Sequence, residues 1–103
     1  MKIIKLLSEK ISEELCDAKA YAELSVKYKE EYPDLARDFY NLSLQEMDHK
    51  TILHNRVTEL IRKYRETKGE PPTEMMAVYD YLHKQQIEKA LEVKTLQGMY
   101  KES

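Results

Sequence analysis

The sequence predicts an all-α fold, an antiparallel bundle of three long helices in a single domain over residues 1–103. Three observations predict it. The chain holds only two Gly and three Pro among many helix-favouring residues, so breaks are few. Apolar residues recur every three or four positions, as on one face of a helix. Two short breaks divide the chain into three stretches of similar length, each about 45 Å long as a helix.

The first helix is expected over residues 2–31. It is predicted to end before Pro33, because proline disfavours helix at the preceding residue. Its apolar line advances by alternating steps of three and four residues, and a carboxylate interrupts it. The line consists of Ile4, Leu7, Ile11, Glu14, Ala18, Tyr21, Ser25 and Tyr28.

The second helix is expected over residues 34–67, from the proline to the Gly69-Glu70-Pro71-Pro72 break. Its apolar line has the same rhythm, with two polar residues in the middle. The line consists of Leu35, Phe39, Leu42, Glu46, His49, Leu53, Val57 and Leu60. His54 lies off this line and is expected to be solvated.

The third helix is expected over residues 73–101, with Thr73 as its N-cap. Its line consists of Met76, Tyr79, His83, Gln86, Ala90, Val93, Gln97 and Tyr100. His83 is expected as a hydrogen-bonded histidine of the core or its boundary. A register that pairs Tyr79 with Leu60 places Ala90 and Val93 beside the polar residues of the second line. The third helix is therefore predicted to supply no metal ligand.

One antiparallel register aligns the apolar layers of the first two helices along their whole length. The paired layers are Ile4 with Leu60, Leu7 with Val57, Ile11 with Leu53, Tyr21 with Leu42 and Tyr28 with Leu35. In this register Glu14 lies level with His49, and the small Ala18 lies level with Glu46, which leaves space for an ion. The polar interruptions of both lines thus converge on adjacent layers.

These converging residues predict a metal site. Glu46 and His49 are three apart on a helix and point the same way, and Glu14 joins them from the first helix. Carboxylates with an imidazole suit iron, manganese or zinc. Asp17 is a candidate accessory ligand, and Tyr21 is placed to hydrogen-bond a ligating carboxylate. The alternative is that Glu14 and His49 form a buried hydrogen-bonded pair with no metal.

Composition excludes several other classes of function. A net charge of −2 gives no electrostatic reason to bind nucleic acid, and the basic stretch at 56–68 is diluted by glutamates into a solvated helix face. The single cysteine, Cys16, cannot form an internal disulfide, which fits a reducing cytoplasm. No apolar run approaches the ~20 residues that span a bilayer, and the first residues lack a signal-peptide pattern.

The motif residues resemble those of the ferritin-like superfamily, especially the rubrerythrin type, over about half of the chain. The pattern is Glu14 with Tyr21 seven residues later, then Phe39, a Leu-Ser pair and Glu46-Met47-Asp48-His49. The resemblance implies that Glu14 is the first-helix ligand and that Glu46 and His49 are the second-helix ligands. It also implies a di-iron or di-manganese centre for iron oxidation, peroxide reduction or oxygen chemistry.

The sequence departs from this pattern because it has no second Glu…Glu-x-x-His set and no fourth helix. Encapsulated ferritins are similar in this respect, since a dimer completes their site. We therefore expect a homodimer or larger oligomer in which two hairpins form a four-helix bundle, with no nucleic-acid or membrane partner. The third helix would lie outside that bundle or cross to the partner, where Met75, Met76, Tyr79 and Leu82 bury more surface.

The resulting hypothesis is a cytoplasmic ferritin-like protein that binds iron through Glu14, Glu46 and His49. A di-iron site is expected, with manganese or zinc as other metals that suit the ligands. If the protein is an enzyme, it is an oxidoreductase of the di-iron carboxylate type. The alternative hypothesis is a metal-free helical bundle that acts as an oligomerising interaction module, in which the polar residues set the register.

Overall fold

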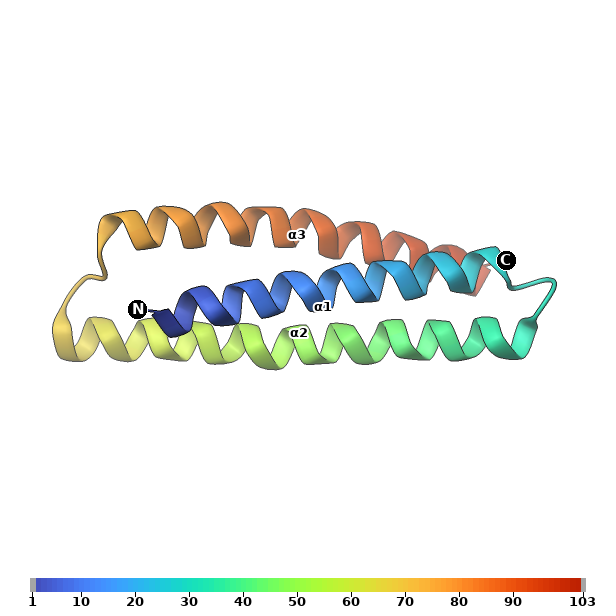
Figure 1. The fold of residues 1–103 in the computed structure, drawn as a ribbon, viewed down its shortest axis with the longest axis horizontal. Helices are drawn as coiled ribbons and strands as arrows, with labels where there is room; N and C mark the ends of the chain where they lie inside the picture. Colours follow the sequence, from blue (N-terminus) through green and yellow to red (C-terminus); the bar gives the residue numbers. More distant parts are fainter. Residues whose placement is uncertain (1, 103) are drawn as a thin grey trace.

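The computed structural model describes residues 2–102, which form three helices in a rod of 55 × 19 × 18 Å (Figure 1). The helices are α1 (Lys2–Lys27), α2 (Pro33–Lys68) and α3 (Thr73–Glu102). α2 runs antiparallel to both of the others. The predicted all-α bundle of three long helices is confirmed. No helix within the described residues has the length and apolarity needed to cross a membrane.

The helix breaks occur at the predicted proline and glycine. α2 begins at Pro33, whose missing N–H costs nothing at a first helical position. After α2, Gly69 has a φ of 85°, a left-handed conformation that glycine adopts without strain. The predicted end of the first helix at residue 31 is wrong, because α1 ends at Lys27. Residues 28–31 instead form the turn that reverses the chain before the proline.

α1 is the central helix of the bundle, and both of the others pack on it (Figure 1). α3 lies closer to α1 than to α2. The side chains that do join α3 to α2, in the Ser43–Gln97 hydrogen bond and the Tyr40–Tyr100 stack, pair within one residue of the predicted register. Polar side chains also join α3 to α1. The amide of Gln86 donates to the Ser8 carbonyl and to Ser12 Oγ, both at 3.0 Å, and Lys19 pairs with Glu92 at 2.9 Å.

Because α1 contacts two helices, it buries two adjacent lines of residues. The predicted line is at least half-buried throughout, and a second line that includes Ser8, Leu15 and Ala22 is fully buried. On α2 the fully buried residues are Ala36, Ser43, Val57 and Ile61. They lie mostly one position beyond the predicted line, so Leu35 and His49 are exposed. The predicted line of α3 is buried or half-buried at every position.

Ser43 ties all three helices together and provides a test of this packing. Its fully buried hydroxyl donates to the Ala18 carbonyl at 2.7 Å and accepts from the Gln97 amide at 2.9 Å. We expect Ser43→Ala to lower the free energy of unfolding by about 1–2 kcal/mol, because two buried polar groups lose their partner. Thermal unfolding followed by circular dichroism measures the loss. Thr95→Ala, at an exposed hydroxyl bonded only to its own helix, should cost much less.

Candidate metal centre

Glu14, Glu46 and His49 come together on the seam between α1 and α2. One potential ligand atom from each lies within 4.8 Å of the others. His49 Nδ1 is 3.5 Å from Glu14 Oε2 and 3.7 Å from Glu46 Oε1. Ligands about 2.0–2.2 Å from a shared ion are roughly 3–4 Å apart, so small side-chain rotations would close the group around one. The register deduced from sequence therefore places these three residues together as the structure does.

The two carboxyl groups of this site are partly buried and lie close enough to share a hydrogen bond. The Glu14 and Glu46 side chains are only 24% and 18% exposed. The pKa of Glu46 is raised to about 7, chiefly by a hydrogen bond shared with Glu14, then by burial and by the charge of Glu14. His49 lowers it, but by less. Without a cation, the site therefore favours a proton between its two carboxyl groups, and a bound metal ion would neutralise the same charge.

The alternative of a buried Glu14–His49 hydrogen-bonded pair does not describe this arrangement. The His49 side chain is 55% exposed, so the imidazole is not buried. Its 3.5 Å separation from Glu14 is long for a hydrogen bond between a nitrogen and a carboxylate oxygen. The imidazole instead stands at the mouth of the seam, with one edge toward the carboxylates.

The two accessory residues lie near this group without joining it. Asp17 is exposed, and its charge is the smallest of the effects that raise the pKa of Glu46. The predicted partner layer of Tyr21 is Leu42, but its ring stacks on Phe39 at 6.2 Å between centroids. An accessory ligand role for Asp17 and a hydrogen bond from Tyr21 to a ligand stay predictions.

α3 adds no residue to this group in the part of the chain that the structure describes. The rings of the two other histidines, His54 and His83, stack at 5.0 Å between centroids. His54 was expected to be solvated, and this is wrong because it is half-buried against His83. A signal existed in the sequence. His54 lies seven residues after Met47 and seven before the buried Ile61, so it belongs to the inward column of α2.

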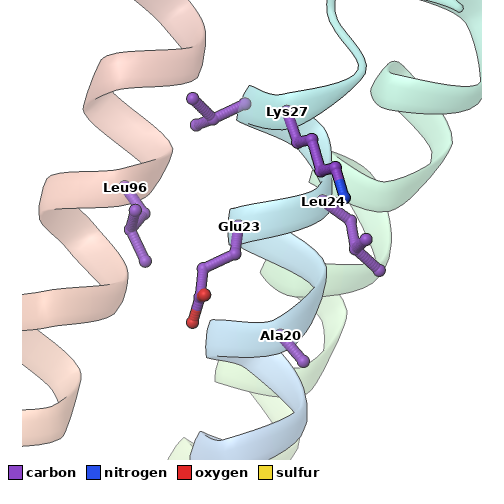
Figure 2. Close-up of a pocket in the computed structure, with 6 residues that line it drawn as sticks. Ala20, Glu23, Leu24, Lys27 and Leu96 are labelled. Carbon is purple, nitrogen blue, oxygen red and sulfur yellow. The ribbon is translucent and has the colours of Figure 1, made fainter.

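The widest hollows are not at the metal group. An open groove of about 640 Å³ lies between α1 and α3. Figure 2 shows Glu23 pointing into it and Leu96 on the opposite wall. Its charged residues, Glu23 and Lys27, are not joined by any histidine or second carboxylate. Among the described residues, the group of carboxylates and imidazole that could hold a metal ion therefore lies on the α1–α2 seam and not in this groove.

Comparison with known proteins agrees with this geometry. No significant match to the chain was found among curated proteins or solved structures. The family model described as Rubrerythrin matches residues 5–102, which include nearly all of α1, the whole of α2 and α3, and the whole candidate site. The chain therefore belongs to the rubrerythrin family.

Proposed function

We propose that this protein binds iron at a di-iron carboxylate centre formed by Glu14, Glu46 and His49 of two copies of the chain. The observation that carries the proposal is the convergence of two carboxylates and an imidazole on one seam. Membership of the rubrerythrin family supports it, since its members typically bind iron. Manganese or zinc would suit the same donors, so the identity of the metal is part of the test.

A single chain supplies only half of such a centre. Carboxylate-bridged di-metal sites in helical bundles use about four carboxylates and two histidines, and one chain brings two and one. A two-fold axis beside the seam would double this set to the full complement. Because α3 packs on α1 away from the group, the mouth of the site stays open to a second copy.

The surface around the site supports such a dimer. We define the open face as the apolar residues that lie on the same outward side of α1 and α2 as the metal group. The open face consists of Ile3, Leu7, Tyr21, Leu35, Phe39, Leu42, Leu53 and Leu60. Ile3 is 46% exposed and Leu35 is 44% exposed, while the others are half-buried. A second hairpin packed on this face would bury them and complete a four-helix bundle.

The chemistry proposed for this centre is redox. If bound there, a pair of ferrous ions would supply two electrons, enough with two protons to reduce one hydrogen peroxide to two waters or one dioxygen to hydrogen peroxide. Glu14 and Glu46 would hold the metal, and Glu46 would release its proton as the metal binds. His49 would coordinate the metal through Nδ1, the ring nitrogen nearest to the two carboxylates. This redox role would make the protein an oxidoreductase.

Metal content tests the proposal directly. Protein purified without chelator and loaded aerobically with ferrous iron should hold about one transition metal per chain by elemental analysis. Glu46→Ala and His49→Ala should lose the metal, because each removes one of few ligands. Chelator should lower the melting temperature of the wild type and leave these variants unchanged, since a ligand of the folded state stabilises it.

Glu13→Ala is the matched control, because Glu13 neighbours Glu14 on α1 but is 63% exposed and pairs with Lys10. It should keep the metal. A content below one metal per two chains after loading would contradict the proposal. That result, with a dimer still present, would favour the alternative of a metal-free oligomerising module whose polar layer sets the register.

A further inference from the structure

The His54–His83 stack is separate from the metal group, which contains neither of these histidines. The two imidazole rings are nearly parallel, with 8° between their planes and 5.0 Å between their centroids. Tyr79 continues the stack, 5.7 Å from His83. His54 comes from α2, whereas His83 and Tyr79 come from α3. The stack therefore bridges the two helices that otherwise meet least.

The surroundings of the stack disfavour positive charge. A small cavity of about 80 Å³ beside it is lined by Ile11, Lys50, His54, His83, Gln86, Ile87 and Ala90. α1 contributes the apolar Ile11, α2 contributes the ammonium of Lys50, and α3 contributes the neutral amide of Gln86. Both amide hydrogens of Gln86 are already bonded to α1. The carboxylate of Asp80, one turn before His83, is exposed. Burial raises the pKa of Tyr79, and the charge of Asp80 raises it further.

We propose that the His54–His83 stack is a proton-sensitive latch, which holds the first half of α3 against α2 at neutral pH and releases it in mildly acidic solution. A neutral pair of imidazoles stacks as two aromatic rings do. A protonated pair places two cations face to face beside Lys50, with no carboxylate among the cavity-lining residues to offset them.

The direction of the effect follows from His54. Burial lowers the pKa of His54 below its ordinary 6.5, and the charges of His83 and Lys50 lower it further. The fold therefore favours the neutral ring. A group whose pKa is lower in the folded state contributes stability above its unfolded pKa and loses it as the pH falls. The latch is closed above pH 6.5 and opens as the pH falls through the lowered pKa of His54.

The opening should be local to one half of α3. The other half is held separately, by the Gln97–Ser43 hydrogen bond and by the Tyr40–Tyr100 stack at 4.6 Å. Neither contact contains a histidine. The segment expected to loosen is therefore residues 74–90, between the α2–α3 loop and the middle of the helix.

Hydrogen exchange with the full chain tests the latch. Protection factors for residues 74–90, each taken relative to intrinsic exchange at the same pH, are compared at pH 7.5 and 5.0. They should fall several-fold in the wild type, because between the ordinary pKa of 6.5 and the lowered pKa of His54 the open state binds a proton that the closed state does not. Residues 95–102 should change much less. A change below twofold in residues 74–90 would overturn the proposal.

Two sets of variants locate the titrating groups. His54→Phe/His83→Phe keeps two stacked rings without a titratable group, so its protection should be the same at both pH values. If that variant does not fold, His83→Gln makes the same comparison with one charge removed. Glu46→Gln/His49→Gln removes the ionisable groups of α2 from the metal group. Its protection factors for residues 74–90 should fall between pH 7.5 and 5.0 by the same factor as in the wild type. Equal loss of protection in the wild type and the His83 variants would overturn the latch.

Discussion

Leu42→Glu and Leu35→Glu are each expected to prevent formation of the proposed dimer and to abolish metal loading. Both residues lie on the open face, on the same side of α2 as His49. A glutamate there would be buried without a partner in the dimer, and symmetry repeats the penalty on both chains. If each buried glutamate weakens dimerisation by about 2 kcal/mol, the dissociation constant of the dimer should rise roughly 10³-fold. Light scattering across a dilution series measures the change.

Two features keep this result interpretable. Leu35 is already 44% exposed in the single chain, so its replacement should leave the fold of the monomer intact by circular dichroism. Ile52→Glu is the matched control, because Ile52 is 66% exposed on another side of α2. It should leave both dimer and metal unchanged. A wild type that stays monomeric at all micromolar concentrations with metal bound would show that one chain provides the whole site.

The fold and the three candidate ligands were predictable because they depend on local spacing. Alternating steps of three and four place Glu14 and His49 on the facing lines of two helices, and the turn at Pro33 fixes their register. A shift of one turn would have brought apolar residues against the carboxylates. Spacing within two neighbouring helices was therefore enough to bring the group together.

The position of α3 was less predictable because its apolar residues are distributed around the whole helix. Val78, Ile87 and Leu91 are all more than 45% exposed on different sides of it. Hydrophobic spacing alone could not select between α1 and α2 as its neighbour. Gln86 joins α3 to α1 through hydrogen bonds to Ser8 and Ser12. These partners lie more than 70 residues away along the chain, so no spacing pattern within α3 indicates them.

Buried serines and histidines were the other part that spacing could not assign. Ser8 and Ser43 are polar by composition, yet each is 2% exposed or less. The Ser43 hydroxyl donates to the Ala18 carbonyl of another helix, and the backbone carbonyl of Ser8 accepts from the Gln86 amide, so polar atoms that lose water gain a partner. For His54, the seven-residue spacing from Met47 and Ile61 indicates an inward position, but it does not indicate which residue of another helix its ring stacks on.

Glu46→Gln is expected to make the metal-free protein more stable at pH 8 while it removes metal binding. The pKa of Glu46 is raised to about 7 from 4.5 in the folded state, chiefly by its hydrogen bond with Glu14. An acid with a raised pKa contributes stability below its unfolded pKa and loses it as the pH rises through the folded value. Metal-free wild type is therefore penalised above pH 7, where both carboxyl groups are charged. Glutamine keeps a hydrogen-bond donor toward Glu14 without the charge.

Thermal unfolding of metal-free protein from pH 5 to pH 8 measures the difference. The gain of Glu46→Gln should be about 1 kcal/mol at pH 8, or roughly 4–8 °C in Tm, and it should shrink toward zero at pH 5. Glu13→Gln makes the same change of charge at an exposed neighbour of the group and should show no such trend. Added iron should then reverse the order of stability, because only the wild type binds it. Equal Tm values for wild type and Glu46→Gln at every pH would show that the two carboxylates do not repel each other, and the electrostatic reason for a cation at this site would fail.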